Sequence, residues 1–189
     1  MSTFRSLFKH IATAIALAIM FCAPVLAQEA DLQDESALLE RLAVADRDEA
    51  IHLDRQLQTL WAKSGSPSMD LLLKRGRDAL EVDDVRAAIE HLTALTDHAP
   101  DFAEGWHARS AAFFEAELYG PAMADLERAL SLNPNNYNAI FGLGAMLEVF
   151  GDKKRAHAAY SRVLAIHPYH EQVTKAVERL QPYVEGEAL

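Results

Sequence analysis

The 189 residues are enough for one modest domain, and half of them are apolar, which excludes an intrinsically disordered chain. The formal net charge of −10 provides no basic surface for phosphate groups, so we expect no nucleic-acid partner. Only 8 residues are glycine and 7 are proline, and a composition rich in alanine, leucine and glutamate favours helices.

Residues 1–27 have the organisation of a secretory signal peptide. Arg5 and Lys9 form a positive start, an apolar run covers residues 11–23, and small residues precede a cleavage position after Ala27. The apolar run is shorter than the roughly 20 residues of an ordinary membrane span. We therefore expect cleavage after Ala27, a periplasmic or secreted protein, and no stable membrane span afterwards. An uncleaved membrane anchor is the alternative.

Cleavage would also change the chemistry of the mature protein. Cys22 is the only cysteine, and its removal would leave no thiol, disulfide or cysteine metal ligand. The net charge would fall from −10 to −12, because the removed segment holds two basic residues and no acidic one. The mature protein would therefore depend on packing alone for its stability.

Residues 28–66 predict a helical hairpin, with helices over 35–45 and 47–63. Asp46 followed by Glu49 is an N-terminal capping signature for the second helix. That helix carries an apolar stripe made of Ala50, Leu53, Leu57, Leu60 and Trp61. The hairpin is interpreted as a cap, a degenerate repeat or a self-association surface, so a homo-oligomer remains open.

Residues 67–168 contain three copies of a 34-residue unit, at 69–100, 103–134 and 137–168. Three columns illustrate the register: Pro100, Pro134 and Pro168; Ala88, Ala122 and Ala156; Gly76, Ser110 and Gly144. The small residues predict that two helices of a unit approach closely, and each proline predicts the end of a second helix. Turn signals between the paired helices are Asp83-Asp84, Tyr119-Gly120-Pro121 and Gly151-Asp152.

This pattern resembles the tetratricopeptide repeat (TPR), a helix–turn–helix unit of 34 residues. The third unit matches best, with Ile140, Leu143-Gly144, Leu147, Ala156, Tyr160 and Pro168. In the second unit, Arg109-Ser110 replaces the usual Leu-Gly pair. The resemblance implies an all-α, TPR-like α-solenoid of three helical hairpins, preceded by the N-terminal hairpin. A C-terminal capping helix is expected within residues 169–184 and is predicted to stop at Pro182; residues 185–189 form a tail.

The resemblance also implies a concave groove lined by the first helix of each unit. Helical spacing selects the candidate protein-binding residues. They are Lys74, Arg77, Glu104, His107, Phe114, Asn138, Phe141 and Glu148. Phe114 and Phe141 either anchor a peptide or pack under the terminal helices. Only Lys74 and Arg77 could clamp a C-terminal carboxylate, and we interpret both as solvated helix charges.

The sequence contains no catalytic or cofactor motif. It has no Gly-x-Ser-x-Gly elbow, no phosphate loop and no His-Glu-x-x-His pair. His167 and His170 flank Pro168 and could bind a metal loosely, but without further ligands we interpret them as exposed turn residues. We therefore expect no enzyme activity, no catalytic residue, no cofactor and no metal.

These features predict an exported adaptor or scaffold that binds a protein or peptide in its concave groove. Exported TPR proteins of other kinds leave two alternatives open. One is a periplasmic chaperone or assembly factor for envelope proteins, and the other is an accessory subunit of an envelope enzyme. Binding to many unfolded chains would favour the chaperone, whereas one stable partner would favour the adaptor.

Overall fold

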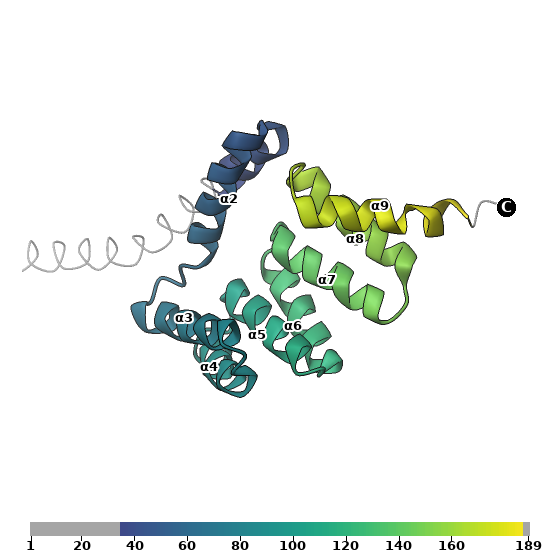
Figure 1. The fold of residues 1–189 in the computed structure, drawn as a ribbon. Coiled ribbons are helices and arrows are strands. Elements are labelled where there is room, and N and C mark those ends of the chain that lie inside the picture. The colour runs from purple at the N-terminus through teal and green to yellow at the C-terminus, as the bar shows by residue number, and fades with distance from the viewer. Residues whose placement is uncertain (1–34, 187–189) are drawn as a thin grey trace, which may run out of the picture. The chain divides into compact units, whose positions relative to one another are not determined.

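The computed structural model describes residues 35–186, which form helices joined by short connections and contain no strand (Figure 1). A first helix covers residues 35–44. The helices that follow are α2 (Arg47–Trp61), α3 (Pro67–Glu81), α4 (Val85–His98), α5 (Ala103–Glu115), α6 (Tyr119–Leu132), α7 (Tyr137–Val149), α8 (Lys153–Ile166) and α9 (Glu171–Glu185). The predicted signal peptide and its cleavage position lie outside the described residues. Within residues 35–186, no helix is long and apolar enough to cross a membrane.

The helices of the repeat region pair as hairpins. Helix α3 packs against α4, α5 against α6, and α7 against α8. Successive hairpins meet through α4 with α5 and through α6 with α7, and α9 covers α8. The succession from α3 to α9 can be followed in Figure 1. The predicted all-α fold of three TPR-like hairpins with a C-terminal capping helix is therefore confirmed.

Each hairpin turns through one residue in the left-handed backbone conformation. These residues are Asp83 (φ 58°), Glu117 (φ 57°) and Gly151 (φ 78°), which lie 34 residues apart. The turn signal at Tyr119-Gly120-Pro121 was misplaced, because α6 already begins at Tyr119. Pro121 lies in the first turn of α6, where a backbone N–H has no helical acceptor and its absence costs nothing.

Polar side chains fix where several helices begin. The side-chain oxygens of Asp46, Asp84, Asn136 and Asp152 accept backbone N–H bonds from the first turns of α2, α4, α7 and α8. The predicted capping signature is confirmed, because Asp46 Oδ1 accepts the N–H of Glu49 at 2.9 Å. A cap of this kind contributes about 1 kcal/mol, so these residues define the helix boundaries.

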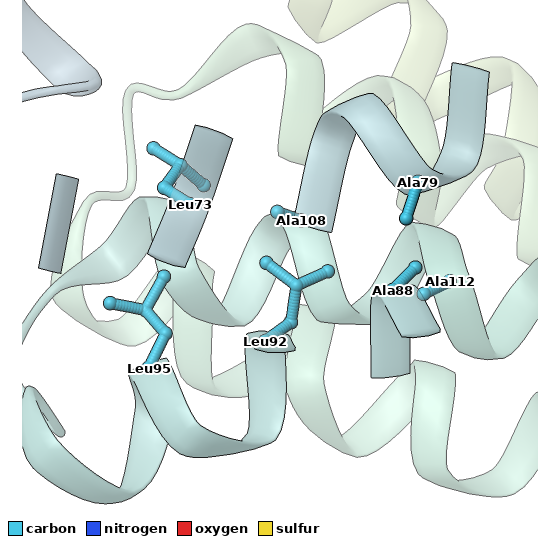
Figure 2. Close-up of a cluster of buried hydrophobic side chains, with 7 residues drawn as sticks. All are labelled: Leu73, Ala79, Ala88, Leu92, Leu95, Ala108 and Ala112. Carbon is cyan, nitrogen blue, oxygen red and sulfur yellow. The ribbon is translucent and has the colours of Figure 1, made fainter. Parts of the chain in front are cut away.

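The core of the first hairpin combines leucines with alanines. Its buried residues are Leu73, Ala79, Ala88, Leu92, Leu95, Ala108 and Ala112 (Figure 2). A Cβ added at Gly76 would lie 2.5 Å from Leu92 Cδ2, and one at Gly144 would lie 2.7 Å from Tyr160 Cδ1. Contacts this short are not tolerated in a close-packed interior. Glycine at this column therefore lets the two helices of a unit approach, as the repeat pattern predicts.

The capping helix extends past the proline that was expected to end it. Helix α9 runs to Glu185 and contains Pro182. Proline removes one backbone hydrogen bond of the helix, and in the last turn this cost is small. The N–H of Gly186 bonds to the carbonyl oxygen of Pro182 at 3.1 Å, which continues the helical pattern. The prediction that Pro182 stops this helix is wrong by about one helical turn.

Candidate functional site

A pocket of about 490 Å³ lies between α2, α3, α5, α7 and the start of α9. It is lined by Gln58, Trp61, Arg77, Glu104, His107, Asn138, Phe141, His170 and Gln172. This volume lies in the range of pockets that hold small ligands or short chain segments. The lining mixes aromatic rings, amides and ionisable groups, so the pocket can offer both apolar contact and hydrogen bonds.

Most of the candidate groove residues converge on this pocket. Arg77, Glu104, His107, Asn138 and Phe141 all line it. Glu104 and Asn138 occupy the same position of successive units, and so do His107 and Phe141. Because α5 and α7 present the same face to the pocket, helical spacing was sufficient to select these side chains.

The carboxylate of Glu104 is the most buried polar group of the pocket lining, with 5% of the residue exposed. Arg77 forms an ion pair with Oε1, His107 Nδ1 lies 3.0 Å from the same oxygen, and Asn136 Nδ2 donates to Oε2 at 2.9 Å. Burial by itself would raise the pKa of Glu104, but His107, Arg77 and Asn136 together hold it below its usual value. Glu104 is therefore ionised and ties α3 and the start of α7 to α5.

Tyr137, at the first position of α7, joins α2 to the repeats. Its hydroxyl donates to Asp54 Oδ1 at 2.5 Å, and its ring centroid lies 5.0 Å from that of Trp61 in an edge-to-face contact. The residue is completely buried. Burial, reinforced by the bond to Asp54, raises the pKa of Tyr137 above its usual value. The phenol is therefore a permanent hydrogen-bond donor in the seam between α2 and α7.

The two histidines at the α8–α9 turn are not the exposed turn residues that were expected. His167 is only 8% exposed, and its ring meets Tyr137 at 5.4 Å. His170 is half-buried, packs 5.6 Å from Phe141 and lines the pocket. Burial lowers the pKa of both rings below the usual histidine value. Spacing along the chain could not reveal this, because the turn packs against Tyr137 from a different unit.

No group of three or more His, Cys, Asp or Glu side chains within residues 35–186 could hold a metal ion. His167 and His170 have ring centroids 5.5 Å apart and meet edge to face. Nδ1 of His167 is buried and has no hydrogen-bond partner among the described residues. This pair therefore contributes packing rather than a coordination site.

Two candidate groove residues lie outside the pocket lining. Lys74 pairs with Asp78 one turn along α3, with Nζ 2.6 Å from Oδ2 and both side chains exposed. Phe114 packs into the core of the second hairpin, where its ring lies 5.7 Å from that of Tyr119. Lys74 is thus a solvated helix charge, and Phe114 is used within its own unit.

Glu148 is the third candidate that does not line the pocket. It accepts the hydroxyl of Tyr160 at 2.8 Å and both terminal nitrogens of Arg179, at 2.5 and 2.8 Å. The hydrogen bonds from Arg179 are the main reason why the pKa of Glu148 lies below its usual value. Glu148 therefore fastens the capping helix α9 to the third hairpin.

The sequence reasoning missed Gln58, Trp61, His170 and Gln172, which complete the pocket. All of them lie outside the 34-residue columns, so the repeat register assigned them no position. Trp61 was recognised only as the end of an apolar stripe. An aromatic residue directly before the break at residues 64–67 was the one available signal that this end of α2 meets another element.

No protein-family model matches the sequence. A TPR repeat-containing protein of Rhizobium etli is 30% identical over 139 residues, a match that covers 71% of this chain and 68% of that protein. The first TPR domain of Spaghetti, solved bound to an HSP90 peptide, has a TM-score of 0.60 at 22% identity and covers 64% of this chain and 95% of its own. MamA has a TM-score of 0.57 at 22% identity, covering 78% of this chain and 83% of its own. With the Rhizobium relative, the repeat columns and the hairpin fold in agreement, this chain belongs to the tetratricopeptide repeat family.

Proposed function

We propose that the protein is an exported adaptor that binds a segment of a partner protein in the pocket between α2, α3, α5, α7 and α9. The observation that carries this proposal is the convergence of Glu104, His107, Asn138 and Phe141, from equivalent positions of successive units, on one pocket. The similar TPR domain of Spaghetti was solved with a bound peptide, which supports a peptide as the class of ligand.

The lining of the pocket suits a peptide backbone flanked by an apolar side chain. Gln58, Asn138 and Gln172 carry amides, which donate and accept hydrogen bonds as peptide groups do. Phe141 and Trp61 offer ring surface beside them. The charges of Arg77 and Glu104 offset each other, so we expect little preference for a strongly charged ligand.

The proposal assigns the protein no catalytic step of its own. Glu104 is the only carboxylate among the lining residues, and it is held ionised by three partners rather than placed to transfer a proton. Binding alone is therefore the activity that this pocket supports.

Photo-crosslinking tests the binding site. p-Benzoylphenylalanine placed at exposed Gln172, on the pocket, should capture a partner in native cells, whereas the same group at exposed Lys74 should not. The purified partner should then bind the Phe141→Ala variant about 10-fold or more weakly, since buried aromatic anchors dominate interface energies. Lys74→Ala is the matched control and should bind normally.

Three results distinguish the candidate functions. Equal capture from Gln172 and Lys74, or unchanged affinity of a folded Phe141→Ala variant, would mean that the pocket is not the binding site. Capture of one defined partner supports the adaptor. Capture of many unfolded chains at Gln172 would instead favour a chaperone or assembly factor.

The export part of the proposal rests on the organisation of residues 1–27 in the sequence. Protein purified from cells should begin at Gln28 and be found outside the cytoplasm. N-terminal sequencing of each cell fraction measures both properties. A chain that keeps its first 27 residues and remains in the cytoplasm would overturn the export proposal and leave the pocket proposal untouched.

A further inference from the structure

We propose that α2 is a detachable cover of the pocket and that a partner gains full access only when α2 moves away. This inference rests on the proposed function of the same pocket. Helix α2 lies outside the repeats, yet it supplies Gln58 and Trp61 to the lining. One side of the pocket is therefore formed by an element that the hairpin stack does not itself include.

The contacts that hold α2 against the repeats and α9 lie along one face of the helix. Arg47, Asp54 and Trp61 are spaced seven residues apart, which places them on the same face. Arg47 Nη1 donates to Glu171 Oε1 at 2.8 Å, and Asp54 accepts the hydroxyl of Tyr137. Trp61 meets the ring of Tyr137. This face thus bonds to α9 at one end and to α7 further along.

These attachments are few and mostly polar. The side chains of Arg47 and Glu171 are 64% and 67% exposed, so their ion pair adds little stability. The closely packed helix pairs among residues 47–185 are α3–α4, α4–α5, α5–α6, α6–α7, α7–α8, α8–α9 and α3–α5, and α2 belongs to none of them. Elements held by few apolar contacts open at a lower free-energy cost than the core. Helix α2 can therefore detach while the hairpins stay folded.

The connection between α2 and α3 suits such a movement. It covers residues 62–66, and Gly65 has φ +81° with no neighbouring atom within 4 Å of an added Cβ. The α3 end of the connection is anchored, because Ser64 Oγ donates to Asp70 Oδ1 at 2.5 Å. A change of backbone angles in this short segment would move α2 without disturbing α3.

The contacts that α2 would give up define the partner that can replace it. The hydroxyl of Tyr137 is buried and would need a new acceptor, since an unsatisfied buried donor is costly. The ring of Tyr137 would also lose its contact with Trp61. A peptide that carries a carboxylate and a large aromatic side chain about two helical turns apart would satisfy both groups. The partner is therefore an amphipathic acidic and aromatic segment that imitates α2.

The first test measures detachment without any ligand. In the full mature chain, Asp54→Asn should raise amide hydrogen exchange in residues 47–61 about 10-fold or more, because a hydrogen bond to a charged acceptor is lost. Exchange in α5 and α7 should not change. Asp48→Asn, an exposed position in the first turn of α2, is the matched control. Tyr137→Phe removes the same bond from the other side and serves if the first variant folds poorly.

The second test uses a synthetic peptide with the sequence of Arg47–Trp61 as the probe. It should bind the Asp54→Asn protein about 10-fold more tightly than the wild type, in which the chain's own α2 competes for the site. A peptide with alanine at the positions of Asp54 and Trp61 should not bind. Binding to the opened protein would support both the cover and the partner chemistry.

Two results would overturn the proposal. Unchanged exchange of α2 in both Asp54→Asn and Tyr137→Phe would show that α2 is a fixed wall, while partner capture at Gln172 would still uphold the proposed function. Faster exchange without tighter binding of the probe peptide would show that α2 moves but does not compete for the pocket. Failure of the proposed function itself is seen separately, as absence of capture at Gln172.

Discussion

Arg109 on α5 forms a two-pronged ion pair with Asp125 on α6. Nε donates to Oδ2 at 2.7 Å and Nη2 donates to Oδ1 at 2.9 Å, and the two side chains are only 13% and 7% exposed. The same guanidinium donates to Thr96 Oγ1 on α4 at 2.7 Å and lies 4.8 Å from the ring centroid of Trp106. The replacement of the usual Leu-Gly pair by Arg109-Ser110 thus provides a polar tie between α4, α5 and α6.

Replacing Asp125 by alanine should destabilise the protein by about 3–5 kcal/mol, because it leaves a nearly buried guanidinium without its counter-charge. Urea unfolding followed by far-UV circular dichroism measures this loss. The double variant Arg109→Leu/Asp125→Leu should lose much less, since apolar residues can replace a buried ion pair at little cost. A double variant as unstable as Asp125→Ala would contradict this account of the pair.

Gly144→Ala should destabilise the third hairpin by about 1–3 kcal/mol, because the added methyl group collides with the ring of Tyr160. Gly120→Ala is the matched control, since a Cβ at this exposed position in α6 meets no atom within 4 Å. There, alanine should raise the stability by roughly 0.4–1 kcal/mol. Thermal unfolding of both variants gives the comparison. Equal effects at the two glycines would show that the close approach at Gly144 is unimportant.

His167→Phe should flatten the pH dependence of stability on the acid side of neutrality. Burial lowers the pKa of His167 below its usual 6.5, so the unfolded chain takes up a proton before the folded one does. The unfolding free energy of the wild type therefore falls as the pH drops below 6.5, until the folded ring is protonated as well. Nearby Asp54 opposes this effect, whereas His170 adds to it.

Urea unfolding between about pH 5 and pH 8 tests this prediction. At the alkaline end, the phenylalanine variant should be at least as stable as the wild type, because it removes a buried nitrogen without a partner. His98→Gln, at an exposed position in α4, should leave the wild-type slope in place. An unchanged slope in His167→Phe would mean that this ring is not responsible.

Glu117→Gly should stabilise the protein by about 0.5 kcal/mol. Its left-handed conformation costs a residue with a side chain about 1–2 kcal/mol, and the extra entropy of glycine in the unfolded chain offsets roughly 0.5–1 kcal/mol of the gain. Gly151→Ala, at the same position of the third unit, should have the opposite effect. Thermal melting of the two variants measures it, and a loss of stability in Glu117→Gly would contradict the strain at this turn.

Much of the fold could be predicted because the repeat makes local rules reinforce one another. The proline columns mark the ends of α4, α6 and α8, and the glycine column marks close helix approaches at Gly76 and Gly144. The errors fell where one local signal acted alone. Pro182 and the Tyr119–Pro121 turn were judged from residue type, whereas the effect of a proline depends on which backbone N–H it removes.

The sequence by itself determined the helical units, their register and the face that α5 and α7 turn toward the pocket, because helical periodicity and packing columns are encoded between neighbours in the chain. The tertiary structure alone decided what closes that pocket. The bond between Asp54 and Tyr137 spans 83 positions, and Trp61 and His170 join the pocket from outside the repeats. No periodic spacing relates these residues, so only the packing of α2 and the α8–α9 turn against α7 brings them together.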